Sequence, residues 1–105
     1  MIAIVDYGVG NLFSLRSSLA KLGLEAVVTA DPEILRKADR LILPGVGAFA
    51  DAMAKLEATG LVPVLQEEAR TKPLLGICLG MQLLFERSYE YGTHAGLGLI
   101  PGEVC

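Results

Sequence analysis

Short apolar runs alternate with helical patterns along most of the chain. Four runs rich in Ile, Leu and Val predict buried strands over residues 2–5, 25–29, 40–43 and 74–77. Apolar residues at helical spacing, with their start and stop signals, predict helices over residues 12–22, 32–38, 49 to near 60, 61–71 and 79–85. Asn11 and Asp31 are the expected N-caps of the first two helices. From about Arg87 the chain becomes polar and rich in glycine, and no further strand is predicted there.

This alternation predicts an α/β fold. Consecutive strands joined through helices require crossover connections, which give a parallel sheet with helices on both faces. In such a sheet, ligands collect at the carboxyl ends of the strands. Three glycine-bearing loops are expected at that edge, namely residues 8–11, residues 44–47 and the turn around Cys78. We therefore expect the functional site where these loops converge.

The turn around Cys78 carries the strongest chemical signal. The sequence Gly76-Ile77-Cys78-Leu79-Gly80 places a cysteine between two glycines where the fourth strand meets a helix. This pattern is typical of a nucleophile elbow, in which a sharp turn exposes the central residue and the glycines avoid collisions across the turn. The N-terminus of the following helix favours the thiolate, which is the reactive form. On the motif alone, the alternative is a cysteine that fills a buried apolar space.

The loop Pro44-Gly45-Val46-Gly47 is the second candidate element. Attack by sulfur on a carbonyl creates an oxyanion, which needs two N–H donors directed at it. We expect one donor from the backbone of Leu79 and another from Val46 or Gly47. The alternative is a tight turn that only starts the next helix.

The loop Gly8-Val9-Gly10-Asn11 lacks the third glycine of the dinucleotide-binding pattern, so it does not match that pattern. Because Asn11 suits the N-cap position, the simplest interpretation is a turn that opens a helix. A role in binding a partner protein is the functional alternative, since such loops often carry function.

Two polar residues after the turn could hold a polar substrate. Gln82 lies one helical turn beyond the cysteine, and Glu90 follows in a charged stretch. The alternatives are a solvent-exposed amide or a backbone hydrogen bond for Gln82, and a solvated charge for Glu90. His94 is the single histidine and could serve a cysteine as a base, but nothing in residues 91–96 orients its ring, so a surface position is favoured. Cys105 has neither a helix start nor a glycine frame and is expected to be incidental.

The composition is that of a globular protein. The chain has 105 residues, enough for one domain with a core, and a net charge of −3 without a basic run. No nucleic-acid-binding or membrane-binding surface is therefore expected. Two cysteines do not form a disulfide framework, and the N-terminus does not match a signal peptide, so a cytoplasmic location is expected. One histidine and two distant cysteines do not form a metal-ligand set, so no metal or cofactor is expected.

Taken together, four segments resemble the class I (triad-type) glutamine amidotransferases, and within them the glutaminase subunits of imidazole glycerol phosphate synthases. The segments are Ile4-Val5-Asp6-Tyr7-Gly8-Val9-Gly10-Asn11-Leu12, Leu43-Pro44-Gly45-Val46-Gly47-Ala48-Phe49, Gly76-Ile77-Cys78-Leu79-Gly80-Met81-Gln82-Leu83-Leu84-Phe85 and Gly96-Leu97-Gly98-Leu99-Ile100-Pro101-Gly102. Related hydrolases and chaperones of the same superfold often have His directly after the elbow cysteine, and Leu79 stands there in this chain.

The resemblance implies a three-layer, flavodoxin-like parallel sheet and the hydrolysis of glutamine to glutamate and ammonia. Cys78 matches the nucleophile that forms a glutamyl thioester, and no cofactor is implied. Further positions match family residues. By this resemblance, Val46 and Leu79 would supply the oxyanion-hole amides, Gly45 and Gly47 would let that loop turn, and Gln82 and Glu90 would bind glutamine.

The resemblance also implies a partner. Ammonia would pass to a (β/α)8-barrel cyclase subunit in histidine biosynthesis, giving a heterodimer. The face that carries Gly8, Gly10 and Asn11, together with residues 45–47, is the implied docking side.

The chain departs from the family in length. The family's catalytic His and its orienting Glu lie close to the C-terminus, and His94 does not match that position. Residues 1–105 therefore resemble the N-terminal part of a single domain, and the fragment alone is expected to be inactive. An uncovered apolar edge beside the last strand is also expected, with self-association as its consequence. The alternative function is a non-catalytic α/β module that binds a partner protein.

Overall fold

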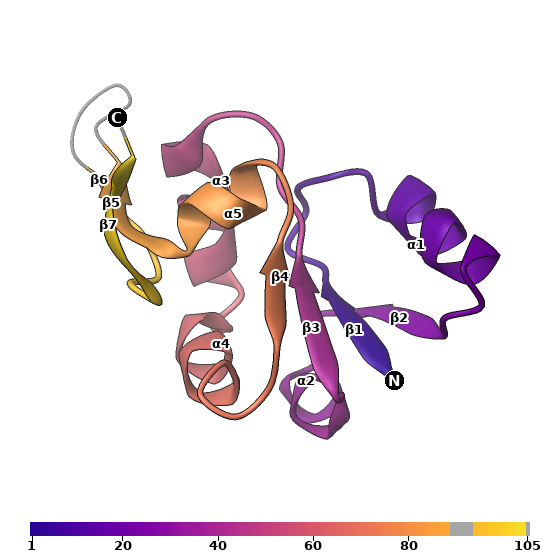
Figure 1. The fold of residues 1–105 in the computed structure, drawn as a ribbon. Coiled ribbons are helices and arrows are strands. Elements are labelled where there is room, and N and C mark those ends of the chain that lie inside the picture. The colour runs from indigo at the N-terminus through magenta and orange to yellow at the C-terminus, as the bar shows by residue number, and fades with distance from the viewer. Residues whose placement is uncertain (89–93, 105) are drawn as a thin grey trace.

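The computed structural model describes residues 1–88 and 94–104, and its centre is a parallel sheet (Figure 1). The four strands lie in the order β2-β1-β3-β4. Their bounds are β1 Ile2–Val5, β2 Ala26–Thr29, β3 Arg40–Leu43 and β4 Leu74–Gly76. All three pairings are parallel, as the alternation of strands and helices predicts.

Five short helices in the described ranges connect and follow these strands. Their bounds are α1 Leu12–Lys21, α2 Pro32–Lys37, α3 Phe49–Ala58, α4 Val62–Glu68 and α5 Leu79–Leu83. The two predicted N-caps are confirmed, because the side chain of Asn11 accepts a hydrogen bond from the Ser14 amide and that of Asp31 accepts one from the Glu33 amide. Within the described residues, no helix has the length and apolar character needed to cross a membrane.

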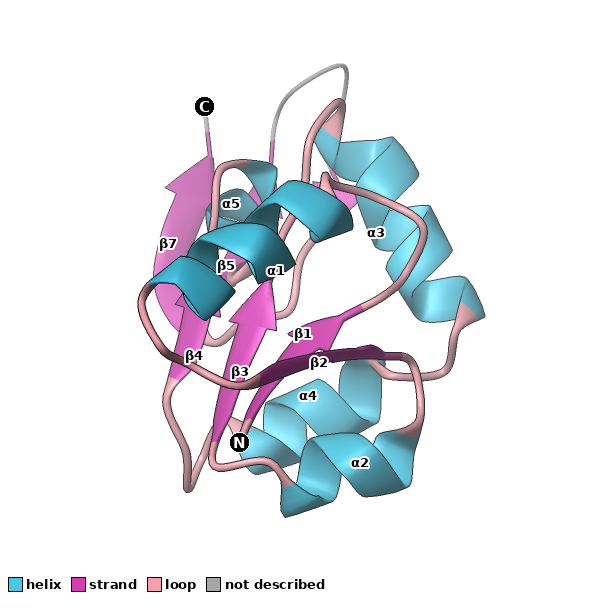
Figure 2. Ribbon diagram, turned by 90° about the vertical axis from the view of Figure 1, so that its right-hand side faces the viewer, coloured by secondary structure: helices cyan, strands magenta, loops and turns pink. Residues whose placement is uncertain are grey.

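The two faces of the sheet are covered to different extents. Val5, Leu41 and Leu43 pack on one face in a core with buried residues of α2, α3 and α4, namely Leu35, Leu56 and Leu65. Ile4 and Ile42 point to the opposite face, where the leucines of α1 pack. Figure 1 shows α1 on one side of the strands and α3, α4 and α5 on the other, and in Figure 2 α1 stands alone in front of the sheet.

The last part of the chain differs from the sequence-based prediction. Instead of an irregular polar segment, it forms a second sheet of three strands in the order β6-β5-β7: β5 Phe85–Ser88, β6 His94–Ala95 and β7 Ile100–Val104. The predicted helix over residues 79–85 ends at Leu83. Amides from residues 97–100 donate to the carbonyls of Leu83, Leu84 and Phe85, at 2.8–3.0 Å. These pairings join residues distant in sequence, so a local pattern does not reveal them.

Candidate functional site

Cys78 lies between the end of β4 and the start of α5, with its side chain exposed. Its φ of 54° is the only positive value among the non-glycine residues that the structure describes. A left-handed backbone is unfavourable for a residue with a side chain, and it persists only where surrounding contacts impose it. The predicted strained turn is therefore present, and the alternative of a buried filler cysteine is excluded.

The glycines on either side of Cys78 are required by close packing. A Cβ atom at Gly76 would lie 2.6 Å from the Cα of Met81, and one at Gly80 would lie 1.9 Å from the carbonyl oxygen of Leu43. Both contacts are with backbone atoms, so no rotation of a side chain could relieve them. The sequence argument for these glycines is confirmed, and the structure adds that Gly80 sits directly against the end of β3.

The 44–47 loop contacts the turn around Cys78 directly. The Leu79 amide donates a hydrogen bond of 3.1 Å to the carbonyl oxygen of Gly45. A Cβ atom at Gly45 would lie 2.8 Å from the Gly80 nitrogen, so only glycine fits this approach. One of the two amides expected to bind an oxyanion therefore has the 44–47 loop itself as its acceptor in this structure.

Tyr7 also contacts the 44–47 loop. Its hydroxyl donates a hydrogen bond to the carbonyl oxygen of Pro44, and its side chain is buried. Burial raises the pKa of Tyr7 to about 12, so the hydroxyl remains a neutral donor at any physiological pH. Sequence reasoning did not single out Tyr7. The signal that could have found it is an aromatic residue with a polar tip two residues after a buried strand, at the carboxyl edge.

The loop of residues 8–11 completes the group of three loops. A Cβ atom at Gly10 would lie 3.1 Å from the Cβ of Pro44, which places the two loops in contact. Gly8, Asn11 and Val46 are exposed on this edge, with Val46 60% exposed. The predicted convergence of the three loops is confirmed.

The other candidate residues lie on α5, in the second sheet or outside the described residues. Gln82 lies on α5, one turn beyond Cys78, and is half-buried. Glu90 and Cys105 lie outside the described residues. The backbone of His94 pairs with Ser88 in the second sheet, which is separate from the sheet that contains β4. Among the described side chains, no three His, Cys, Asp or Glu residues are grouped so that they could hold a metal ion.

The arrangement matches a known family. The sequence model described as "Glutamine amidotransferase class-I" matches residues 3–94. The chain belongs to the class I glutamine amidotransferases. The match includes the cysteine turn, the 44–47 loop that contacts it and the 8–11 loop that contacts Pro44.

Curated relatives cover the whole of this amidotransferase chain. A protein of Exiguobacterium sibiricum named "Imidazole glycerol phosphate synthase subunit HisH" is 61% identical over 104 residues, which is 99% of this chain and 53% of that protein. A protein of Sulfurimonas denitrificans with the same name is 57% identical over 105 residues, which is 51% of its length. The chain therefore spans about half the length of the curated relatives it matches.

Solved structures confirm the fold. A structure titled "Crystal structure of glutamine amidotransferase" superimposes with a TM-score of 0.80 at 22% identity, covering 98% of this chain and 55% of that one. A putative peptidase E protein from Listeria monocytogenes gives a TM-score of 0.74 at 19% identity, covering 94% and 62%. Both share the α/β fold that the sequence predicts.

Proposed function

We propose that residues 1–105 are the N-terminal part of a single glutaminase domain, in a protein that hydrolyses glutamine to glutamate and ammonia for histidine biosynthesis. The observation that carries this proposal is the exposed Cys78 in a turn with a positive φ, next to the Leu79 amide that donates a hydrogen bond to Gly45 of the 44–47 loop. The family match covers both segments. The names of the curated relatives supply the pathway.

Cys78 is the nucleophile in this proposal. Its thiolate attacks the side-chain amide carbon of glutamine, and the carbonyl oxygen becomes an oxyanion. Collapse of this intermediate breaks the C–N bond, and ammonia leaves after taking up a proton. Water then attacks the glutamyl thioester, which releases glutamate and returns the thiol. Gln82 and Glu90 are the residues proposed to bind glutamine.

The oxyanion hole consists of the amides of Val46 and Leu79. Because the Leu79 amide is bonded to the Gly45 oxygen, this hydrogen bond has to break before an oxyanion can take its place. A rotation of the peptide unit between Gly45 and Val46 removes that oxygen and turns the Val46 N–H toward the site. The rotation changes ψ of Gly45, which has no side chain to restrict it, and φ of Val46. Gly47 follows directly and has a φ of +94°, which only glycine adopts readily.

The proposed partner is a (β/α)8-barrel cyclase that receives the ammonia, forming a heterodimer with this protein. The edge that carries Gly8, Gly10, Asn11 and residues 45–47 is its proposed docking side, and Gly8, Asn11, Val46 and Gly47 are exposed on it. Because Gly10 contacts Pro44, a partner bound to the first loop would also bear on the loop that controls the oxyanion hole.

The fragment alone is expected to lack turnover, because acid–base groups for the leaving ammonia would come from the part of the domain outside residues 1–105. The nucleophile can still be tested in this chain with a glutamine-like electrophile such as a diazoketone. We expect Cys78 to be labelled about tenfold or more faster than Cys105 at neutral pH, and a Cys78→Ser variant to lose that fast labelling. Equal, slow labelling of both cysteines would refute the proposed nucleophile and favour a non-catalytic binding module.

A further inference from the structure

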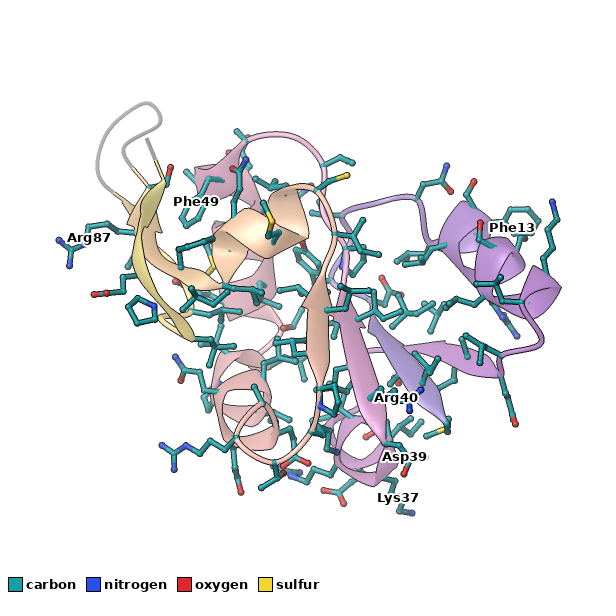
Figure 3. All side chains as sticks on the ribbon, viewed as in Figure 1. Phe13, Lys37, Asp39, Arg40, Phe49 and Arg87 are labelled. Atoms are coloured by element: carbon teal, nitrogen blue, oxygen red, sulfur yellow. The ribbon has the colours of Figure 1, made fainter. Side chains whose placement is uncertain are left out.

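The 44–47 loop connects two elements that are themselves fixed. Upstream, it continues β3, whose last residue, Leu43, accepts a hydrogen bond of 3.0 Å from the Ile77 amide. Downstream, it leads into α3, whose first residue, Phe49, is fully buried (Figure 3). A Cβ atom at Gly96 would lie 3.1 Å from Cζ of the Phe49 ring, so this end of the loop is packed against the segment after β6. Movement of the loop is therefore confined to the few residues between these two ends.

Tyr7 is bonded to the upstream part of the loop. Its hydroxyl donates to the carbonyl oxygen of Pro44, which belongs to the 44–45 peptide unit. A Cβ atom at Gly45 would lie 2.7 Å from that hydroxyl oxygen and 2.8 Å from the Gly80 nitrogen. Gly45 is therefore enclosed between the tip of Tyr7 and the start of α5. The ring of Tyr7 belongs to the buried core, which gives its hydroxyl a fixed position.

The 45–46 peptide unit lies in the exposed part of the same loop. Its carbonyl oxygen accepts the hydrogen bond of 3.1 Å from the Leu79 amide, and Val46 and Gly47 are both exposed. In the proposed reaction this unit rotates and presents the Val46 amide to the oxyanion. A rotation of one peptide unit reaches a defined end point only if the unit before it stays in place.

We propose that Tyr7 is a positioning residue for the oxyanion hole: its hydroxyl fixes the 44–45 unit, so that the 45–46 unit rotates against a stationary neighbour. The inference rests on the proposed glutaminase reaction and adds to it a residue that acts through the loop. Oxyanion-hole donors are effective because they are already oriented when the charge develops. Such orientation depends on supporting residues that packing and hydrogen bonds hold in place. Tyr7 is held in this way by its buried ring and its bond to Pro44.

Removal of the hydroxyl has two expected effects on the loop. The 44–45 unit then follows the motion of the 45–46 unit, so the Gly45 oxygen leaves the Leu79 amide more often. The Val46 amide also loses its defined orientation at the moment when the oxyanion forms. Because the oxyanion exists only along the reaction path, the loss falls on kcat, and KM for glutamine stays the same.

The kinetic test needs a complete domain, because the short chain of residues 1–105 is expected to lack turnover. The chain is continued into the second half of the Exiguobacterium sibiricum relative, and this chimera is assayed with the proposed cyclase partner from that organism. We expect Tyr7→Phe to lower kcat for glutamine hydrolysis by about tenfold and to leave KM within about twofold. This loss is smaller than the roughly 10²–10³-fold loss that follows removal of a donor itself.

Thr59→Val is the matched control. The Thr59 hydroxyl also donates to a backbone carbonyl, that of Leu56, but at the end of α3 that is far from the 44–47 loop. The control variant loses a comparable hydrogen bond and is expected to keep the parent kcat. A Tyr7→Phe protein with the parent kcat overturns the inference. An equal loss of kcat in Thr59→Val also overturns it, because general destabilisation would then explain both results.

Amide exchange in the same chimera tests the positioning independently of turnover. The Leu79 amide, which is bonded to the 44–47 loop, is compared with the Ile77 amide, which is bonded to β3. Tyr7→Phe is expected to speed exchange at Leu79 by about tenfold relative to Ile77, whereas Thr59→Val leaves this ratio unchanged. An unchanged ratio in Tyr7→Phe overturns the inference. A parent chimera that does not hydrolyse glutamine counts against the proposed function instead, and the exchange ratio still decides whether Tyr7 fixes the loop.

Discussion

Replacing Gly80 by alanine tests whether close packing forms the elbow. An added Cβ would lie 1.9 Å from the carbonyl oxygen of Leu43, whereas an ordinary carbon–oxygen contact is about 3.3 Å. The start of α5 and the end of β3 would therefore have to separate by roughly 1.4 Å. Overpacking of this kind costs about 1–3 kcal/mol, and the upper end applies here because the Cβ is fixed directly to the backbone and its partner is a backbone atom.

A second, smaller effect of the substitution acts in the opposite direction and stabilises the helix. Alanine in place of glycine within a helix stabilises it by up to about 1 kcal/mol. The net expectation for Gly80→Ala is a loss of about 2 kcal/mol in the free energy of unfolding, measured by urea denaturation. Met81→Ala changes an exposed side chain of the same helix and serves as the control, with an expected change of about 1 kcal/mol or less. A Gly80→Ala protein as stable as the parent would refute the packing argument.

Four further predictions concern Tyr7, Asn11 and the association of the short chain. Tyr7→Phe leaves the Pro44 carbonyl without its donor and should lower the free energy of unfolding by about 1–2 kcal/mol in urea titrations. The pKa of Tyr7 is raised from 10.0 to about 12, so the folded state holds this proton more tightly. The stability of the parent should therefore be complete below pH 10 and should fall between pH 10 and 12, by up to about 3 kcal/mol, whereas Tyr7→Phe should lose this dependence. Asn11→Ala removes the cap of α1 and should cost about 1 kcal/mol in the same assay, and an unchanged midpoint would argue against the cap. The short chain should self-associate in sedimentation experiments as its concentration rises, and Leu75→Glu should reduce this, because Leu75 is 57% exposed although it lies in a strand of the central sheet. A parent that stays monomeric throughout would contradict it.

The sequence predicted the central sheet because its signals are local. Each strand is a short apolar run, and residues such as Asn11 and Asp31 cap their helices through contacts two or three positions away. The parallel order follows from the helical crossovers. The end of α5 and the second sheet were not predicted, because they depend on amides of residues 97–100 that bond to carbonyls more than ten positions earlier.

The part of the site that depends on local sequence was predicted, and the part that depends on contacts between distant residues was not. The conformation of Cys78 follows from its glycine frame, which is visible in the sequence. The occupation of the Leu79 amide by the Gly45 oxygen depends on how two loops distant in the sequence pack together. The contact of Tyr7 with Pro44 likewise joins residues 37 positions apart. Such contacts carry no short-range pattern, so only the folded arrangement reveals them.

The most direct test of the account compares one thiol in two states of the chain. The rate at which the glutamine-like electrophile labels Cys78 is measured in the folded protein and again in concentrated urea, with Cys105 as the internal reference. If the folded turn makes the thiol reactive, the labelling rate of Cys78 divided by that of Cys105 should be about tenfold or more higher in the folded protein than in urea. A folded-state rate equal to or below the unfolded rate would contradict the claim that this turn makes a nucleophile.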